Sequence, residues 1–488
     1  TLCLGLPDSP IAECDVYRSL LYVSLEAGHV AQNIHLAAAE SKVGTVELGG
    51  FLEEPLRQAL RLPLDYWPLI TIIFGYPAIA SSTNYKSKDN IELRWAYPTA
   101  GKYRLPFSMA FTRLKGQKSE EWACGRSKEP TTAFLKACSE AHEWDACGYI
   151  PDNLVWASLR ELKNAINPRE IVSYHNRQYQ RKDFLLKPFN ENQKYFWKEG
   201  RDEVTGNKIY ILSDCIYFPY TPKTPRYTFA NSSGTAAHPD RLEAIKNATF
   251  ELVERDAFMI IWLNRLKTPQ IILKSLPRDI QKRIRELQKL GFKVVVKNFT
   301  LDLTPVLFVF AQSETLPMTT CAACSEFEVT TALDHALMEV EAAIYCRLNS
   351  QSPKPIQPKN VRYTDEHGNL YEQRRFFRQA DFLANGGRLL RLSNVAKNAP
   401  KTWLKLMEQL KAIGPKFITV DLSEDRMHQQ VETLNIIKVF VPGLVPMSFG
   451  YGLEPCGMRR IYNLPVRLGY RAIPISYSQL TKFPHPYT

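Results

Sequence analysis

The sequence lacks a long uninterrupted hydrophobic run. No apolar segment among its 488 residues approaches the 18 or more consecutive residues that a membrane-spanning helix needs. The beginning of the sequence carries no signal-peptide pattern and reads as if it starts inside a domain. Hydrophobic residues make up 45% of the chain and charged residues 23%, as in soluble globular proteins. We therefore expect a cytoplasmic protein with no membrane partner.

Cysteine is too scattered for a disulfide framework. Ten cysteines are spread over the whole chain, whereas disulfide-stapled secreted domains are short and dense in Cys. One close pair, Cys321 and Cys324, forms half of a zinc signature, but no second CxxC or CxxH completes it. We therefore expect reduced thiols, with structural zinc as the weaker alternative.

Signatures of nucleic-acid binding are also missing. The formal net charge of +12 and the pI of about 9.1 suit a partner that carries phosphates or carboxylates. However, the sequence has no zinc-finger spacing, no aromatic RNA-binding signature and no long Lys/Arg block. We expect a basic protein that does not bind nucleic acid.

What the sequence does contain is centred on one predicted helix, residues 240–266. Asp240 stands at the N-cap position, and Glu243 three residues later completes a capping-box pattern. At about 100° per residue, Glu243, Glu251 and Glu254 fall within roughly 80° of one another. Like charges at this spacing repel. The pattern therefore predicts a bound cation, and a solvent-exposed acidic face is the alternative.

A second acidic helix is predicted at 131–146, after a loop of small and basic residues at 124–130. Glu140 and Glu143 share one face of this helix, with Lys136 about 40° from Glu140. Backbone N–H groups in such loops at helix starts bind phosphate. The combination predicts carboxylates that hold a metal close to a phosphate group.

Helices and strands alternate along the rest of the chain. A third helix is predicted from Thr330 to Leu348 and carries Glu339, and strands are predicted at 292–297, 305–311 and 436–442. Residues 352–400 are rich in Lys and Arg and read as an irregular insertion or mobile loop. The pattern predicts an α+β domain of roughly 400 residues.

The N-terminal segment shows a helical period from Val16 to Leu48 and an apolar strand from Pro68 to Phe74. The sequences AGHVAQNIHLAAAESKVGTVELGGF and PLITIIFGYP resemble the C-terminal part of the nitroreductase-like, flavin-dependent azoline dehydrogenases. The resemblance implies a partial nitroreductase-like α+β fragment over residues 1–80. We interpret it as a domain fragment used for packing or partner contact, and a flavin half-site is the alternative.

Four further stretches resemble the YcaO superfamily. They are GRSKEPTTAFLKACSEAHEW, NSSGTAAHPDRLEAIKNATFELVERDAF, VPGLVPMSFGYGLEPCGMRRIYNLPVRLG and the terminal PHPY. Within it they are most similar to the ATP-dependent cyclodehydratases that make thiazolines and oxazolines in ribosomal peptides. The resemblance implies an α+β, YcaO-like ATP-binding domain of mixed sheets and helices over residues 81–488, with a C-terminal tail at 481–488.

The resemblance implies ATP and Mg²⁺ as cofactors and a set of site residues. Matches to the two acidic motifs imply metal ligands at Glu140, Glu143, Glu251 and Glu254. The implied nucleotide contacts are Arg126, Ser127, Lys136, Glu243, Arg255, Glu339, Arg459 and Arg460. The tail residues Pro484, His485, Pro486 and Thr488 are implied to organise the active site, with His485 a candidate general base and an ordinary surface histidine the alternative.

The chain departs from the family pattern at several of these positions. Lys136 stands in place of a Ser, Trp144 in place of an Arg, and Ala342 and Ala343 where a Gln is expected. Thr488 replaces the last Pro of the family's PxPxP terminus. These departures leave open a catalytically degenerate subunit that is kept for complex assembly.

The function that the resemblance implies is cyclodehydration of Cys, or of Ser or Thr, in a ribosomally made precursor peptide. A family member that installs a thioamide or an amidine is the nearest enzymatic alternative. The implied partners are the precursor peptide, an E1-like or winged-helix protein that binds its leader, a flavin-dependent azoline dehydrogenase, and a second copy of the chain in a homodimer.

Overall fold

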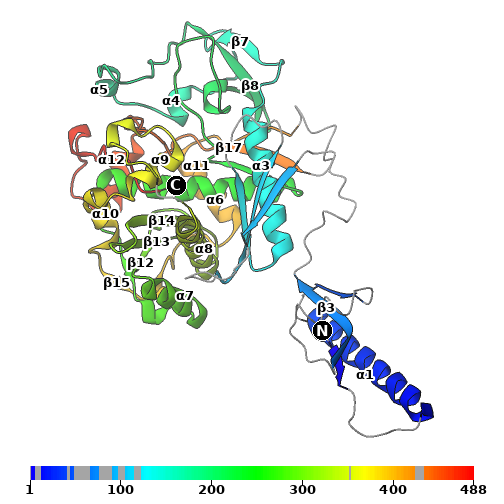
Figure 1. Ribbon diagram of the computed structural model, residues 1–488. Coiled ribbons are helices and arrows are strands. Elements are labelled where there is room, and N and C mark those ends of the chain that lie inside the picture. Colours follow the sequence, from blue (N-terminus) through cyan, green and yellow to red (C-terminus); the bar gives the residue numbers. More distant parts are fainter. Residues whose placement is uncertain are drawn as a thin grey trace. The chain divides into compact units, whose positions relative to one another are not determined.

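The computed structural model describes residues 2–5, 13–40, 44–48, 66–75, 91–96, 105–114, 122–350, 353–423 and 434–487 (Figure 1). The chain divides into two compact units, unit 1 (Thr1–Ser87) and unit 2 (Lys88–Thr488). In the described part of the chain, no helix has the length and apolar character needed to span a bilayer. Each unit is described separately below.

Unit 1 combines one long helix with a small antiparallel sheet. Helix α1 (Glu13–Glu40) accompanies strands in the order β1 (Leu2–Gly5), β3 (Tyr66–Gly75) and β2 (Gly44–Leu48). Ala27, Ala31 and Ala38 are buried, and their spacing of four and seven residues places them on one face of α1.

The prediction of a continuous helical period from Val16 to Leu48 was wrong at its C-terminal end. The helix ends at Glu40, and Gly44–Leu48 forms strand β2. This segment reads GTVEL, in which a helix-weakening Gly is followed by the β-branched residues Thr45 and Val46. Pairing with β3 then fixes the extended conformation.

Unit 2 combines sheets that are antiparallel, except for the parallel pairing of Gln270–Ile271 with Leu389–Leu390, with helices packed against them. One sheet has the order β4 (Ile91–Ala96), β5 (Ser108–Leu114), β6 (Ala123–Ser127). A second has the order β14 (Met318–Ser325), β13 (Val306–Ser313), β12 (Lys293–Asn298), β11 (Gln270–Ile271), β15 (Leu389–Leu390). A third has the order β10 (Thr235–His238), β17 (Asn435–Phe440), β16 (Ile418–Asp421), β8 (Lys194–Asp202), β7 (Val155–Ser158), with β9 (Lys208–Leu212) paired to β8.

The described helices of unit 2 are α3 (Pro130–Gly148), α4 (Pro168–Ile171), α5 (Asn176–Tyr179), α6 (Arg241–Asn264), α7 (Arg278–Lys289), α8 (Val329–Leu348), α9 (Thr364–Leu370), α10 (Phe377–Ala384), α11 (Trp403–Ile413) and α12 (Arg460–Arg467). Together with the sheets they confirm the predicted α+β class. The region 352–400 is more ordered than predicted, because it contains α9, α10 and β15.

Helix α6 forms the centre of the main core (Figure 1). Its N-terminus is capped as predicted, since Asp240 Oδ1 accepts hydrogen bonds from the N–H groups of Leu242 (2.7 Å) and Glu243 (3.1 Å). All side chains from Asp256 to Asn264 are buried. A helix that is buried on all sides at one end has a fixed orientation. The positions of Glu251, Glu254 and Arg255, which precede this buried end, are therefore fixed as well.

Helix α3 packs directly on strands β5 and β6 through small residues. Ala133, Ala137 and Ala141 are almost fully buried and repeat every four residues. Gly125 on β6 faces this stripe so closely that a Cβ atom there would lie 1.8 Å from the carbonyl oxygen of Ala133. The hydroxyl of Thr112 donates to the carbonyl of Ala137 over 2.7 Å. These contacts fix the rotation of α3 about its own axis.

We predict that Gly125→Ala destabilises unit 2, because the added methyl group collides with the backbone of α3. A strained insertion into a packed core typically costs about 1–3 kcal/mol. Thermal unfolding measured by circular dichroism should show a clear fall in melting temperature. Gly148→Ala, at the end of α3, is the control, since its Cβ would meet nothing nearer than 3.6 Å. Equal stability of the two variants would contradict the packing described here.

Candidate functional site

A cavity of about 1990 Å³ lies within unit 2, and a group of acidic side chains lines it. We call this group the carboxylate cluster; it consists of Glu140, Glu143, Glu251, Glu254 and Glu339. Its members come from three helices: α3 supplies the first two, α6 the next two and α8 the last. The structure thus brings together all four predicted metal ligands and the predicted Glu339.

Main-chain N–H groups hold three of these carboxylates. Cys124 N–H donates to Glu140 Oε2 and Ala237 N–H donates to Glu143 Oε1, each over 2.7 Å. Gly234 N–H donates to Glu251 Oε2 over 3.1 Å. Gly234 has φ = +76°, a left-handed conformation that favours glycine. Each bond fixes one oxygen of a glutamate.

Burial and mutual repulsion make the carboxylate cluster electrostatically costly. Burial raises the pKa of Glu140 to about 7, against the lowering effect of Arg126. Burial, followed by the charge of Glu140, raises the pKa of Glu143 well above its ordinary value. Burial is also the main cause of the raised pKa of Glu251 and Glu254, where Arg255 acts in the opposite direction. A bound cation would relieve this cost.

The donor set of the cluster fits Mg²⁺. It consists only of carboxylate oxygens, the hard ligands that Mg²⁺ prefers, and Mg²⁺ typically combines one or two carboxylates with phosphate oxygens. Raised carboxylate pKa values are what a polyvalent cation site shows in the absence of its cation. The prediction that Glu140, Glu143, Glu251 and Glu254 hold Mg²⁺ stays a prediction.

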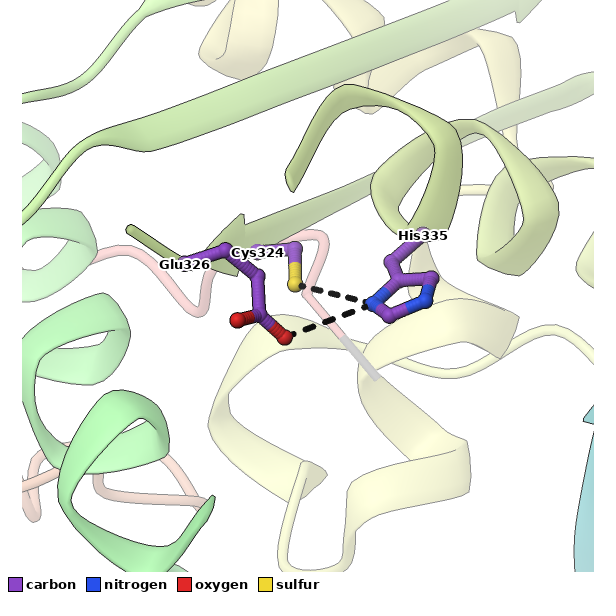
Figure 2. A group of neighbouring side chains, drawn as sticks. All are labelled: Cys324, Glu326 and His335. Carbon is purple, nitrogen blue, oxygen red and sulfur yellow. Dashed lines mark hydrogen bonds and ion pairs between the residues drawn. The ribbon is translucent and has the colours of Figure 1, made fainter. Parts of the chain in front are cut away.

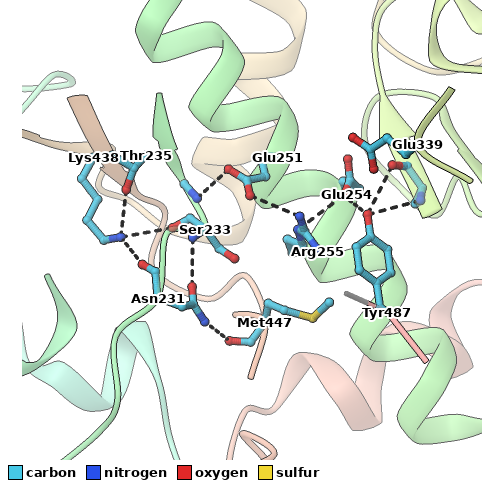
Figure 3. Close-up of polar contacts among 12 residues, drawn as sticks. Asn231, Ser233, Thr235, Glu251, Glu254, Arg255, Glu339, Lys438, Met447 and Tyr487 are labelled. Carbon is cyan, nitrogen blue, oxygen red and sulfur yellow. Dashed lines mark hydrogen bonds and ion pairs between the residues drawn. The ribbon is translucent and has the colours of Figure 1, made fainter. Parts of the chain in front are cut away.

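Arg255 lies beside the carboxylate cluster and lines the same cavity. Its guanidinium approaches Glu251 Oε1 at 3.4 Å and Glu254 Oε1 at 3.3 Å (Figure 3). Its Nη1 is buried and has no hydrogen-bond partner among the described residues. Because a buried, unpaired guanidinium N–H is costly, this atom fits a phosphate oxygen. The predicted phosphate contact of Arg255 stays a prediction.

Strand β6 and helix α3 supply further basic groups. Arg126 and Lys136 both line the cavity, and Arg126 pairs with Glu339 at 3.0 Å. Ser127 lies at the end of β6, and its hydroxyl accepts a hydrogen bond from the N–H of Glu129 over 3.2 Å. The structure therefore places Arg126 and Lys136 near the carboxylates, while Ser127 makes a local turn contact.

Glu243 does not join the carboxylate cluster. Its side chain is 45% exposed and pairs with Lys246 at 2.6 Å. Glu243 and Glu251 share an angular face of α6, but eight residues separate them by about 12 Å along the helix axis. The angular argument from the sequence took no account of this axial distance.

Arg460, predicted as a nucleotide contact, lies in a separate ion-pair network. Its guanidinium binds Asp256 in a bidentate manner, with distances of 2.9 and 3.0 Å, and contacts Asp302 at 2.5 Å. The neighbouring Arg459 is exposed and precedes α12. The network joins α12 to α6. The structure does not bring either arginine together with the carboxylate cluster.

The C-terminal tail is packed into the core of unit 2. The carbonyl of Pro484 accepts a hydrogen bond from the hydroxyl of Tyr371 over 2.9 Å, and Tyr487 forms a parallel bridge with Cys321 on β14. His485 is buried, with its Nε2 2.9 Å from the carbonyl of Ser448. Burial lowers the pKa of His485 well below its ordinary value. The imidazole is therefore neutral, and a surface position is excluded.

Of the other predicted tail residues, Pro486 is buried between His485 and Tyr487. Thr488 lies outside the described residues.

Sequence reasoning missed Tyr487. Its hydroxyl donates to Glu254 Oε1, and the Arg255 guanidinium carbon lies 4.4 Å from its ring centroid (Figure 3). The cation–π contact fixes Arg255, and the hydrogen bond fixes Glu254. The signal was present in the sequence as a tyrosine between the predicted tail residues Pro486 and Thr488.

Lys438 on β17 was also missed. It is buried and donates to the carbonyls of Asn231 (2.7 Å) and Ser233 (3.3 Å) and to the hydroxyl of Thr235 (3.0 Å) (Figure 3). Burial lowers its pKa, while Glu251 and Glu143 act in the opposite direction. It anchors the loop whose Gly234 N–H binds Glu251. A single lysine within the apolar strand sequence IIKVFV was the available signal.

The YcaO family model, described as a cyclodehydratase that binds ATP and Mg²⁺, matches residues 124–445, which is more than half of the chain. The chain belongs to the YcaO family. A nitroreductase family model matches residues 18–76, as the N-terminal resemblance predicted. The description of this family confirms the prediction of ATP and Mg²⁺ as cofactors.

Solved YcaO-type structures share the fold of this chain. A heterocyclase in complex with substrate and cofactor gives a TM-score of 0.64 at 20% identity, covering 81% of this chain and 55% of that protein. YcaO from Methanopyrus kandleri, bound with AMPPCP and Mg²⁺, gives 0.55 at 16% identity, covering 72% and 85%. The Escherichia coli microcin synthetase McbBCD complex with pro-MccB17 bound gives 0.54 at 12% identity, covering 72% and 88%. At these identities the likeness shows the fold.

The N-terminal match has a narrower extent. A putative nitroreductase, MJ1384 of Methanocaldococcus jannaschii, is 38% identical over 58 residues, which is 12% of this chain and 28% of that protein. The chain thus spans about a quarter of this nitroreductase and about half of the first heterocyclase.

We predict that the metal-free YcaO protein loses stability as pH rises through about 7. Folding raises the pKa of Glu140, so the folded state holds a proton that the unfolded chain releases near its ordinary pKa. This contribution is complete below the ordinary pKa of 4.5 and is lost by about pH 7, with a size on the order of 3 kcal/mol. Thermal unfolding between pH 5 and 8.5 measures it.

The variant Glu140→Gln should flatten this pH profile, because the neutral amide has no proton to lose. Glu286→Gln, on the exposed face of α7, is the control and should keep the wild-type slope. Mg²⁺ with a non-hydrolysable ATP analogue should stabilise the wild type more at pH 8 than at pH 6. An unchanged slope in Glu140→Gln would contradict the electrostatic description of the cluster.

Proposed function

We propose that this YcaO protein is an ATP- and Mg²⁺-dependent cyclodehydratase that converts Cys, or Ser or Thr, of a ribosomally made precursor peptide to an azoline. The observation that carries the proposal is the carboxylate cluster. Its glutamates from three helices face one cavity, next to a guanidinium with an unpaired N–H. The cavity of about 1990 Å³ has room for a nucleotide and a peptide segment together.

The reaction balances as follows. The side-chain sulfur or oxygen of the substrate residue bonds to the carbon of the preceding amide, and the amide oxygen takes the γ-phosphoryl group of ATP, which releases ADP. The carbon–oxygen bond then breaks, phosphate leaves, and the nitrogen forms a double bond to carbon as it loses its proton. Two protons are lost, one from the nucleophile and one from the amide nitrogen.

The residues of this chain contribute positioning and charge neutralisation, which phosphoryl transfer mainly requires. Glu140, Glu143, Glu251 and Glu254 would hold Mg²⁺, which when bound would supply positive charge to neutralise the phosphate groups. Arg255 contacts the phosphate through its unpaired N–H, as a buried charged donor does most effectively.

The chain organisation and the partners belong to the same proposal. Residues 1–80 form a nitroreductase-like fragment and residues 81–488 the YcaO domain, which the division near Ser87 supports. A separate leader-binding protein, of the E1-like or winged-helix type, presents the precursor. The nitroreductase-like match supports contact with a flavin-dependent azoline dehydrogenase. A homodimer in the cytoplasm is the proposed setting.

We predict that mass spectrometry of candidate precursor, incubated with the protein, its leader-binding partner and Mg·ATP, shows a loss of about one water mass per modified residue. Glu254→Gln should abolish both this loss and ATP turnover, because one metal ligand becomes a neutral amide. Circular dichroism checks that the fold is retained. A shift of about +16 mass units would indicate thioamide formation instead. ATP binding without turnover would indicate a degenerate subunit.

We predict that Tyr487→Phe lowers the rate of ATP turnover at least tenfold. The change removes the hydroxyl that donates to Glu254 and keeps the ring below Arg255, so Glu254 loses its fixed orientation. The apparent affinity for Mg²⁺ should weaken with it. Tyr477→Phe, at a partly buried tyrosine that precedes the tail, is the control. Normal turnover in Tyr487→Phe would remove this residue from the site.

A further inference from the structure

A second group of potential ligands lies at the end of strand β14. We call it the Cys–Glu–His triad; it consists of Cys324, Glu326 and His335 (Figure 2). Cys324 is on β14, Glu326 directly follows this strand, and His335 lies in the second turn of α8. The YcaO site described above does not use the triad, and none of its three described side chains lines the cavity.

The two-cysteine pattern in the sequence does not make this site. Cys321 and Cys324 are three residues apart on one strand, so their side chains point to opposite faces of the sheet. Cys321 is packed in the main core. The weaker alternative of a CxxC zinc site is therefore excluded by geometry, and Cys324 has different neighbours.

The distances within the triad suit a shared cation. His335 Nδ1 lies 3.9 Å from Cys324 Sγ and 3.6 Å from Glu326 Oε1, and all three donor atoms lie within 4.8 Å of one another. The His–Glu distance exceeds the roughly 2.7–3.2 Å of a well-formed N–H···O bond. Ligands of a tetrahedral zinc ion are about 3.3–3.6 Å apart, given Zn–N near 2.0 Å and Zn–S near 2.3 Å.

We propose that Cys324, Glu326 and His335 form a Zn²⁺ site with an open fourth position. Sulfur, imidazole nitrogen and carboxylate oxygen are all ligands of zinc, whereas Mg²⁺ prefers oxygen alone. Three protein ligands with one open position are typical of zinc sites that bind water or substrate. The all-oxygen carboxylate cluster and the mixed triad therefore select different metals.

The surroundings of the triad allow a metal to enter. The side chains of His335 and Glu326 are 39% and 28% exposed, so solvent reaches the donor atoms. The separation of Cys324 Sγ and His335 Nδ1, 3.9 Å, exceeds the ligand spacing, so the partly exposed side chains of both Glu326 and His335 must rotate slightly to bring the three donors to ligand distances. Strand β14 and helix α8 hold Cys324 and His335.

Zinc displaces a proton when it binds the Cys324 thiol. In the metal-free protein, burial and then the charge of Glu254 raise the pKa of this thiol.

The test uses Co²⁺ as a spectroscopic substitute for Zn²⁺ on the full chain. The protein is stripped with a chelator and kept in excess Mg²⁺, which occupies the carboxylate cluster. Titration with Co²⁺ should give a thiolate-to-cobalt absorption band in the near ultraviolet that saturates near one equivalent, and Zn²⁺ should remove it. The readout does not depend on ATP turnover, so it is independent of the proposed function.

Variants locate the metal. Cys324→Ser should lose the band, and His335→Asn should weaken Co²⁺ binding at least tenfold; because His335 is partly exposed, this variant should still fold. Cys346→Ser, an exposed cysteine on the same helix, is the matched control and should keep the band. The proposal is overturned if the wild type shows no band, if Cys324→Ser retains it, or if His335→Asn binds Co²⁺ as tightly as the wild type.

Discussion

The carboxylate cluster is the constraint on which the rest of the YcaO site depends. Five acidic side chains from α3, α6 and α8 face one cavity, and burial raises the pKa of four of them. Repulsion of this kind costs free energy in a low-dielectric environment. The structure offsets the cost with main-chain N–H groups, with Arg126 and Arg255, and with a site for a cation.

Rigid packing keeps these charges in place. Gly125 and the alanine stripe let α3 approach β6, which aligns Glu140 with the N–H of Cys124. Lys438 anchors the loop that carries the N–H donor to Glu251. Preorganisation of this kind is what positions substrates for phosphoryl transfer. The small residues and the buried lysine therefore serve the site although they do not carry its chemistry.

The C-terminal tail connects the core to the chemistry. It lies in the middle of unit 2 rather than on the surface, and its residue Tyr487 contacts both Glu254 and Arg255. A terminal segment normally frays unless it is held by tertiary contacts. Here the hydrogen bond from Tyr371 and the bridge to Cys321 supply such contacts. The tail is thus part of the site by packing and not only by motif.

The sequence by itself determined the helices that carry the acidic pairs, because the helical period and the N-cap at Asp240 are local properties. It therefore yielded Glu140, Glu143, Glu251 and Glu254. Tertiary structure alone decided which residues meet. It brought glutamates of three helices to one cavity, whereas the axial distance that keeps Glu243 out of the cluster already follows from the residue spacing. It also gave Lys438 and Tyr487 their places, because contacts across hundreds of residues depend on how strands and helices pack.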